Sequence, residues 1–207
     1  MTNTLLLVLS LAFTSFSAHA ELSLGQRIPA LVGEKAEGGS FDLIKDTKSK
    51  TVVFEWLNFE CPFVRKHYID SKNMQETQAW AKEKGVLWIS VASSGKNKKG
   101  KGKEGYMEAS ELLAKKKELG SNADFIIRDV SGQIGRAFGA KTTPHLFIFN
   151  TEGKLAYQGA IDSEASADAD DIKMATNFVK EAVTKLSEGR NYTKQTEAYG
   201  CGVKYGD

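Results

Sequence analysis

Cysteine is scarce in this chain, which has only two, Cys61 and Cys201, among 207 residues. Two cysteines so far apart exclude the disulfide-rich scaffold of small exported domains. They leave two arrangements open, a single structural bridge or a reactive pair. Histidine is also rare, with 3 in the chain, and no two candidate ligands have zinc-finger spacing. We therefore expect neither a metal site nor a bound cofactor.

A strong charge bias is also absent, because 28 basic and 26 acidic residues leave a formal net charge of +2. This balance gives no reason to expect a nucleic-acid partner. Long apolar runs are missing after residue 20, so we expect no membrane span there. Lysines and glycines crowd together in residues 93–105, SSGKNKKGKGKEG, which predict a solvated loop. The alternative for this loop is a basic patch that attracts acidic partners.

The first 20 residues predict a signal peptide rather than a part of the fold. Leu5–Phe13 is an apolar run too short to cross a bilayer, and Ala18-His19-Ala20 is a small-x-small cleavage site. A buried N-terminal helix fits less well, because the polar stretch Glu21–Gly25 follows directly. Export would place the protein in an oxidising compartment, which is the periplasm if the host is a Gram-negative bacterium.

The order of the predicted elements indicates an α/β fold. The expected strands are residues 40–44, 51–57, 86–92, 124–127, 145–150 and 154–157. The expected helices are residues 62–68, 73–84, 106–119, 132–138 and 171–186. Strands that alternate with helices predict a parallel portion of the sheet, and the last two strands predict an antiparallel hairpin. We expect one domain, residues 21–188, and a polar tail, residues 189–207, that carries Cys201.

Cys61 lies where a predicted buried strand gives way to a helix. The apolar run Thr51–Leu57 precedes it, and Pro62 follows at the position where proline best begins a helix. The unpaired N–H groups and partial positive charge of a helix N-terminus stabilise a thiolate and lower the pKa of a cysteine. The alternative is a buried and inert structural cysteine. The flanking Glu60 and Arg65 favour the reactive cysteine, because an apolar helix would lack them.

Three stretches carry a resemblance to a known family: Phe54-Glu55-Trp56, Cys61-Pro62-Phe63-Val64 and Gly135–Gly153. With them the chain resembles the thioredoxin-fold redoxins. This group includes thiol peroxidases of the alkyl hydroperoxide reductase type and periplasmic thiol–disulfide oxidoreductases. The resemblance implies a thioredoxin-like fold, with a mixed central sheet flanked by helices. It also implies a cis peptide bond at Thr143-Pro144 that faces the reactive cysteine, whereas the alternative is an ordinary trans turn proline.

The sequence departs from both branches of this family. Val64 stands where thioredoxins have the second cysteine of their Cys-x-x-Cys motif. Phe54 and Asn58 stand at the proline and threonine positions of the peroxiredoxin pattern Pro-x-x-x-Thr-x-x-Cys. Pro144 replaces the arginine that peroxiredoxins place before the hairpin strand. Peroxide reduction would need a guanidinium from elsewhere, and the candidates are Arg65, Arg128 and Arg136.

Cys201 is the expected partner of Cys61. Gly200 and Gly202 give its backbone freedom, and the polar tail predicts that little apolar burial holds it. A tail thiol of this kind can resolve a sulfenic acid or a mixed disulfide formed at Cys61. The alternative is a permanent structural bridge, which the chain-entropy model credits with about 5 kcal/mol for so long a loop.

The two histidines after residue 20 could act as bases, but we expect packing roles for both. His67 lies six residues after Cys61, which on a helix is away from the face of the cysteine. We therefore expect His67 at the surface or in packing. His145 directly follows Pro144 and could lie near Cys61, yet a strand residue in such a place is more often packed than catalytic.

The residues and the resemblance together predict an exported thiol oxidoreductase. Cys61 would be the nucleophile and Cys201 the resolving thiol, while Thr143 and Pro144 would form the substrate groove. The expected partners are protein thiols and disulfides or a small hydroperoxide, together with an external thiol reductant. Two alternatives stay open: a peroxiredoxin-like hydroperoxide reductase, and a redox-inert binding module with a structural Cys61–Cys201 bridge.

Overall fold

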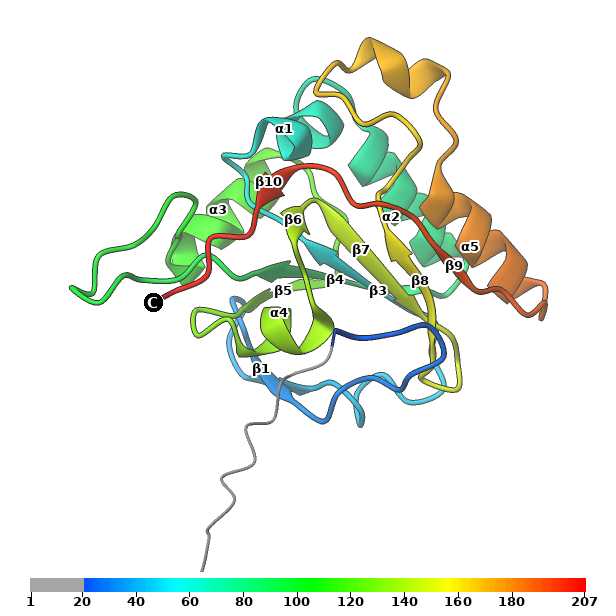
Figure 1. The fold of residues 1–207 in the computed structure, drawn as a ribbon, viewed down its shortest axis with the longest axis horizontal. Coiled ribbons are helices and arrows are strands. Elements are labelled where there is room, and N and C mark those ends of the chain that lie inside the picture. Colours follow the sequence, from blue (N-terminus) through cyan, green and yellow to red (C-terminus); the bar gives the residue numbers. More distant parts are fainter. Residues whose placement is uncertain (1–20) are drawn as a thin grey trace, which may run out of the picture.

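The computed structural model describes residues 21–207, so the expected signal peptide lies outside the described residues. A mixed eight-stranded sheet forms the centre, with strand order β2-β1-β5-β4-β3-β7-β8-β9 (Figure 1). Its strands are β1 (Val32–Lys35), β2 (Ser40–Asp42), β3 (Val52–Trp56), β4 (Leu87–Ala92), β5 (Phe125–Arg128), β7 (His145–Phe149), β8 (Leu155–Gly159) and β9 (Lys194–Gln195). A separate two-stranded sheet joins β6 (Thr142–Thr143) to β10 (Cys201–Gly202).

Helices cover both faces of the central sheet (Figure 1). The helices are α1 (Pro62–Tyr68), α2 (Asn73–Glu83), α3 (Ala109–Glu118), α4 (Gln133–Phe138), the 3₁₀ helix η1 (Asp170–Lys173) and α5 (Phe178–Ser187). α1, α2, α3 and α5 pack on one face, whereas α4 and the N-terminal segment pack on the other. Within residues 21–207, no helix has the length and the apolar surface needed to cross a membrane.

β3 lies in the middle of the sheet, and all five of its residues are buried there. It pairs in parallel with β4 and antiparallel with β7. β4 continues in parallel to β5, and β7 forms the antiparallel hairpin with β8. The predicted mixed sheet, with its parallel portion and its hairpin, is therefore confirmed, and so is the thioredoxin-like α/β class.

The structure differs from the expected elements at several places, most clearly in one added strand, one shorter strand and one later helix start. Val32–Lys35 forms the strand β1, which the sequence does not predict because Gly33 and two charged residues are poor strand formers. Gly33 packs closely against β5, since a Cβ at this position would lie only 2.8 Å from the Ile127 side chain. The strand expected at residues 40–44 ends at Asp42, whose side chain accepts from the backbone N–H groups of the next turn. The helix expected at residues 171–186 begins only at Phe178, because Asn177 caps it by accepting from a backbone N–H.

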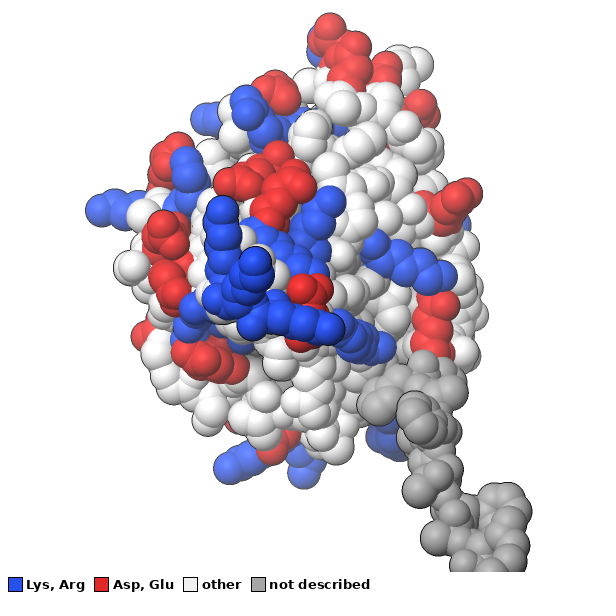
Figure 2. Space-filling model, turned by 60° about the vertical axis from the view of Figure 1, so that its left-hand side comes forward, with Lys and Arg blue, Asp and Glu red and all other residues white. Residues whose placement is uncertain are grey.

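The lysines of the loop, residues 93–105, lie on the surface as expected, whereas Ser93, Ser94 and Gly95 at its start and Gly105 at its end are buried. Figure 2 shows lysine and arginine side chains gathered on this side of the molecule. Lys98 and Lys99 are exposed, while Lys96 pairs with Glu108 at 3.4 Å. Exposed ion pairs of this kind contribute little stability.

Glu55 is the one charged residue of β3, and it is fully buried. Its carboxylate accepts hydrogen bonds from Tyr68 at 2.9 Å, Trp88 at 2.7 Å, Gln78 at 3.0 Å and Ser90 at 3.2 Å. These donors come from α1, β4 and α2, so the carboxylate joins three elements to β3. Burial raises the pKa of Glu55, and the hydrogen bonds only partly oppose this effect.

Phe138 of α4 fixes the other face of the sheet. Its ring lies 5.0 Å from that of Phe54, 4.9 Å from Trp56 and 5.4 Å from Phe147, measured between centroids. We expect Phe138→Ala to lower the free energy of unfolding by about 3–5 kcal/mol, because it removes these contacts and leaves a cavity. Urea denaturation measures the loss. Met174→Ala is the control, since that side chain is 88% exposed, and an equal loss in both variants would contradict the assignment.

The Glu55 carboxyl should also make stability depend on pH. Its folded-state pKa is above the unfolded value of about 4.3, so the folded protein holds the proton more tightly. The resulting stabilisation is present below the unfolded pKa and is lost as pH rises through the folded pKa. Relative to Glu55→Gln, we expect the wild-type free energy of unfolding to fall as pH rises through this window. Urea titrations at several pH values test it, and a constant difference between the two proteins would refute it.

Candidate active site

Cys61 occupies the position that the sequence predicts for it, at the junction of β3 and α1. It is the N-cap of α1, with Pro62 at the first helical position. Its carbonyl oxygen accepts from the backbone N–H groups of Val64 and Arg65, at 3.0 and 2.9 Å. The side chain is buried, with only 1% of the residue exposed. The thiol is therefore held at the end of the central strand and at the start of a helix.

The proline segment faces this thiol, as the resemblance implies. The Thr143–Pro144 peptide bond is cis, so the expectation of a cis proline is confirmed. Cys61 Sγ donates a hydrogen bond to the carbonyl oxygen of Thr143 at 3.0 Å. The backbone before Pro144 is thus in direct contact with the cysteine.

Cys201 reaches the same place from the end of the chain. β10 pairs antiparallel with β6, and its register sets Cys201 opposite Thr143 and Gly202 opposite Thr142. Figure 1 shows the C-terminal segment crossing over the end of the sheet to make this contact. The two cysteines are free thiols, and they lie close enough for each to shift the pKa of the other. Thr143 therefore contacts both cysteines, one through its carbonyl oxygen and one through strand pairing.

Burial raises the pKa of the Cys61 thiol, but hydrogen bonds outweigh burial and leave this pKa below its ordinary value. The donors are the Cys201 thiol, the Thr143 side chain and the backbone N–H groups of Cys201 and Val64. The pKa of Cys201 is raised instead, by burial, by its hydrogen bond to Cys61 and by the charge of Cys61. The opposed shifts mean that Cys61 loses its proton before Cys201 does.

The tail is held more firmly than its polar composition predicts. Thr196 donates its backbone N–H to Gln158 at 3.0 Å, next to the parallel pairing of β9 with β8. Tyr205 donates its hydroxyl to the Ala140 carbonyl at 2.7 Å, and the Arg136 guanidinium lies 4.5 Å from the Tyr205 ring centroid. Hydrogen bonds and half-buried rings, rather than deep apolar burial, hold residues 189–207 in place.

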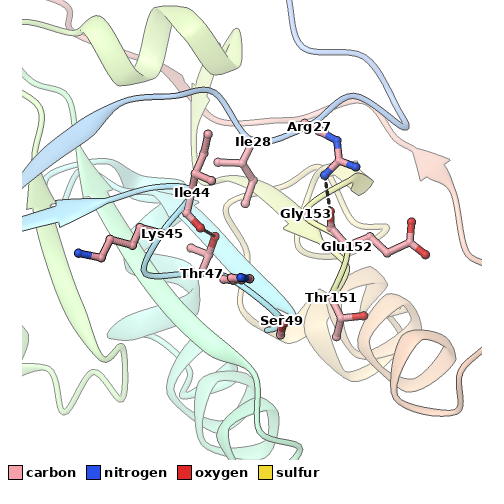
Figure 3. A pocket seen from close by; sticks show the side chains of 10 residues that line it. Arg27, Ile28, Ile44, Lys45, Thr47, Ser49, Thr151, Glu152 and Gly153 are labelled. Carbon is pink, nitrogen blue, oxygen red and sulfur yellow. Dashed lines mark hydrogen bonds between the residues drawn. The ribbon is translucent and has the colours of Figure 1, made fainter.

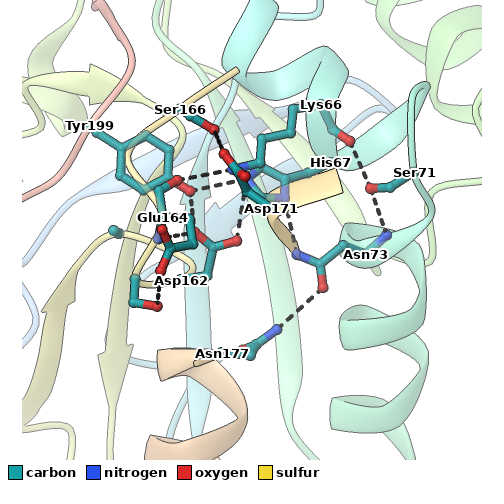
Figure 4. Close-up of polar contacts among 12 residues, drawn as sticks. Lys66, His67, Ser71, Asn73, Asp162, Glu164, Ser166, Asp171, Asn177 and Tyr199 are labelled. Atoms are coloured by element: carbon teal, nitrogen blue, oxygen red, sulfur yellow. Dashed lines mark hydrogen bonds and ion pairs between the residues drawn. The ribbon is translucent and has the colours of Figure 1, made fainter. Parts of the chain in front are cut away.

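Tyr199, two residues before Cys201, enters a buried polar cluster (Figure 4). Its hydroxyl donates to Asp162 and lies 3.3 Å from His67 Nε2. Its ring packs against Phe63 of α1, with centroids 5.9 Å apart. The cluster thus joins the tail to α1, which carries Cys61 at its start. The sequence analysis missed this role, although tyrosines on both sides of Cys201 in an otherwise polar tail were a signal.

Both histidines are buried, so a surface position for His67 is wrong, while the expected packing role is confirmed. His67 is 0% exposed, because Asn73 and Tyr199 enclose its ring with hydrogen bonds of 3.0 and 3.3 Å. His145 packs on Phe147, with ring centroids 4.3 Å apart. Burial lowers the pKa of each histidine to about 3, so both are neutral at neutral pH.

Two of the pockets in residues 21–207 can be placed relative to Cys61, and neither cysteine is among their lining residues. The pocket in Figure 3 has a volume of 640 Å³ and lies between residues that precede β3 and the turn after β7, at the opposite end of β3 from Cys61. The other has a volume of 450 Å³ and is lined by β6 and the tail, including Thr142, His145 and Thr196. Within residues 21–207, no group of three or more His, Cys, Asp or Glu side chains could hold a metal ion.

A thioredoxin-like fold with a cysteine at a helix N-terminus and a facing cis proline defines a class of protein, and the comparisons agree with it. The Redoxin family model matches residues 23–174, and the chain therefore belongs to the Redoxin family. A search of curated proteins finds no match.

Solved structures share the fold. An uncharacterized conserved protein from Geobacillus kaustophilus is 22% identical, with a TM-score of 0.71 over 90% of this chain and 94% of that one. A hypothetical protein from Sinorhizobium meliloti 1021 is 20% identical, with a TM-score of 0.70 over 89% and 96%. The thioredoxin domain of a thiol-disulfide oxidoreductase from Bacteroides vulgatus is 18% identical, with a TM-score of 0.52 over 74% and 98%.

The depressed pKa of Cys61 can be measured directly. We expect the thiolate of Cys61 to form with a midpoint below about 8.5, the ordinary value for cysteine. Ultraviolet thiolate absorption, taken as the difference between the wild type and Cys61→Ser, measures this midpoint. Cys201→Ala should raise it, because that change removes the strongest lowering hydrogen bond. A wild-type midpoint at or above the ordinary value would contradict the assignment.

Proposed function

We propose that this member of the Redoxin family is an exported thiol–disulfide oxidoreductase, with Cys61 as nucleophile and Cys201 as resolving thiol. The observation that carries the proposal is the shared contact with Thr143. The Cys61 thiol donates to the Thr143 carbonyl at 3.0 Å, and Cys201 is paired with the same residue. The two sulfurs can therefore join or separate without unfolding of the domain.

The reaction needs two exchanges. The Cys61 thiolate attacks one sulfur of a substrate disulfide, so that a mixed disulfide forms and the other substrate sulfur leaves as a thiolate. Cys201, once deprotonated, then attacks Cys61 Sγ and displaces the second substrate thiolate. The substrate disulfide gains two electrons and takes up two protons, and the enzyme is left with a Cys61–Cys201 disulfide. An external thiol reductant returns both cysteines to thiols.

The opposed pKa shifts suit this order of events. Hydrogen bonds lower the pKa of Cys61 while the pKa of Cys201 is raised, so Cys61 is the better nucleophile of the two. The charge of Cys61 is one cause of the raised pKa of Cys201. This cause disappears when Cys61 enters a mixed disulfide, so Cys201 becomes easier to deprotonate at the step that needs its thiolate.

Thr143 and Pro144 would form the substrate groove. The carbonyl of Thr143 already contacts Cys61, and its backbone edge suits an extended segment that adds as a strand. Under this proposal the domain, residues 21–188, supplies the nucleophile and the groove, while the tail, residues 189–207, supplies the resolving thiol. The partners are protein thiols and disulfides.

The proposed location is outside the cytoplasm. The apolar run and small-x-small site in residues 1–20 support export, and the periplasm follows if the host is Gram-negative.

The structural neighbour from Bacteroides vulgatus is itself described as a thiol-disulfide oxidoreductase. Among the described residues, no arginine is a hydrogen-bond partner of Cys61, so the guanidinium expected for peroxide reduction has no support here.

Equilibration in glutathione buffers tests the proposal. We expect a Cys61–Cys201 disulfide that forms and reduces while the domain stays folded, with a potential well above about −300 mV, below which structural bridges lie. Mass spectrometry follows both thiols, and thermal melting follows the fold. Cys201→Ser should trap mixed disulfides at Cys61 when a disulfide peptide is added.

Each other outcome identifies an alternative. A Cys61–Cys201 disulfide that resists reduction by glutathione, with unfolding of the domain on forced reduction, would establish a structural disulfide. Rapid consumption of hydroperoxide, with no exchange with disulfide peptides, would establish a peroxidase. Cysteines that never pair would refute the role of Cys201 and leave Cys61 to act with an external thiol.

A further inference from the structure

The backbone edge next to Cys61 is already occupied in this structure. A polypeptide partner that adds a strand beside the cysteine would pair with β6, since Thr143 contacts Cys61 there. That edge is paired with β10, so Cys201 and Gly202 of the same chain lie where the partner would lie. Cys61 is almost completely covered, with 1% of the residue exposed. The tail and a polypeptide partner therefore compete for one edge.

Gly200 shows how closely the tail fits this edge. Its φ is +142°, a conformation that side chains rarely adopt. A Cβ at this position would lie only 2.2 Å from the Thr143 carbonyl oxygen and 2.8 Å from the Thr143 carbonyl carbon. Gly202 differs, because a Cβ there would meet nothing within 4 Å. One glycine is thus required for docking on Thr143, and the other is not.

Few backbone hydrogen bonds hold residues 200–203, although the side chains of Cys201 and Val203 pack at the edges of the two core clusters. The strand β10 has only two residues, and its neighbour Val203 donates one backbone hydrogen bond to Lys141 at 3.0 Å. The Thr143 hydroxyl reaches the Cys201 carbonyl only at 3.5 Å, which is the limit for a hydrogen bond. The stronger contacts lie on either side, at Tyr199 and Tyr205. A short and lightly held segment between two fixed points can open locally while the rest stays folded.

We infer that residues 200–203 are a displaceable strand, and that an extended polypeptide carrying a disulfide replaces them on β6 to reach Cys61. The inference rests on the proposed function of Cys61. The closed tail is the resting state, in which Cys201 holds the position of a substrate cysteine. Opening exposes both the docking edge and the nucleophile, so the tail sets how fast polypeptide disulfides react.

A peptide with one cysteine, activated as a mixed disulfide with thionitrobenzoate, is the probe. The Cys61 thiolate attacks the peptide sulfur, the Cys61–peptide disulfide forms, and thionitrobenzoate leaves with a visible absorbance. All variants carry Cys201→Ser, so that the tail does not compete for the product. Gly200→Ala is the test variant, and Gly202→Ala is its matched control.

We expect Gly200→Ala to raise the rate of peptide capture about ten-fold or more, because opening of the tail limits access to the buried thiol. Gly202→Ala should leave the rate close to that of Cys201→Ser alone. Equal rates in the three proteins would overturn the displaceable strand and leave the proposed function standing. Absence of reaction in all three, also with a small aromatic disulfide, would instead refute the nucleophile itself.

A second measurement holds even if Gly200→Ala does not fold. Hydrogen–deuterium exchange is compared in the Cys201→Ser protein before and after the peptide is trapped on Cys61. We expect faster exchange in residues 200–203, including the Val203 N–H, with little change at the Thr196 N–H. Unchanged exchange in residues 200–203 after trapping would show that the tail stays docked, and the inference would fail.

Discussion

The hydrogen bond from the Cys61 thiol to the Thr143 carbonyl is the contact on which the site depends. It joins the end of the central strand to the segment before the hairpin, two parts of the chain that only the fold brings together. The same backbone residue pairs with Cys201, so a third distant part of the chain is set beside the first two. The two cysteines are therefore brought together by the backbone of one residue, Thr143, rather than by a Cys-x-x-Cys loop.

The electrostatics follow from this arrangement. Burial alone would favour a neutral thiol at Cys61, yet donors from the tail and from the start of α1 reverse that effect. The tail donors include the backbone N–H and the thiol of Cys201, so the ionisation of Cys61 depends on a segment outside its own helix. The histidines take no part in this balance, because burial keeps both of them neutral.

The central strands, the hairpin and the position of Cys61 could be predicted because their signals are local: apolar runs, a glycine-containing turn, and a proline at the first position of a helix. The cis bond at Pro144 followed from the family resemblance. β1 could not be read from its own residues, because its stability comes from packing against β5. The burial of His67 and the docking of the tail depend on contacts between residues far apart in sequence, such as Tyr199 with Asp162, and no local pattern records such contacts.

The pairing of β9 with β8 has a further effect on the molecule. β8 is completely buried along its five residues and would otherwise end the sheet with an open row of backbone donors and acceptors. Such an edge is a template for pairing with another chain, and proteins commonly blunt it with a very short strand. β9 has only two residues and includes Lys194, whose ammonium pairs with Glu181 at 2.9 Å. The C-terminal segment thus covers part of the β8 edge with a short strand, independently of its cysteine.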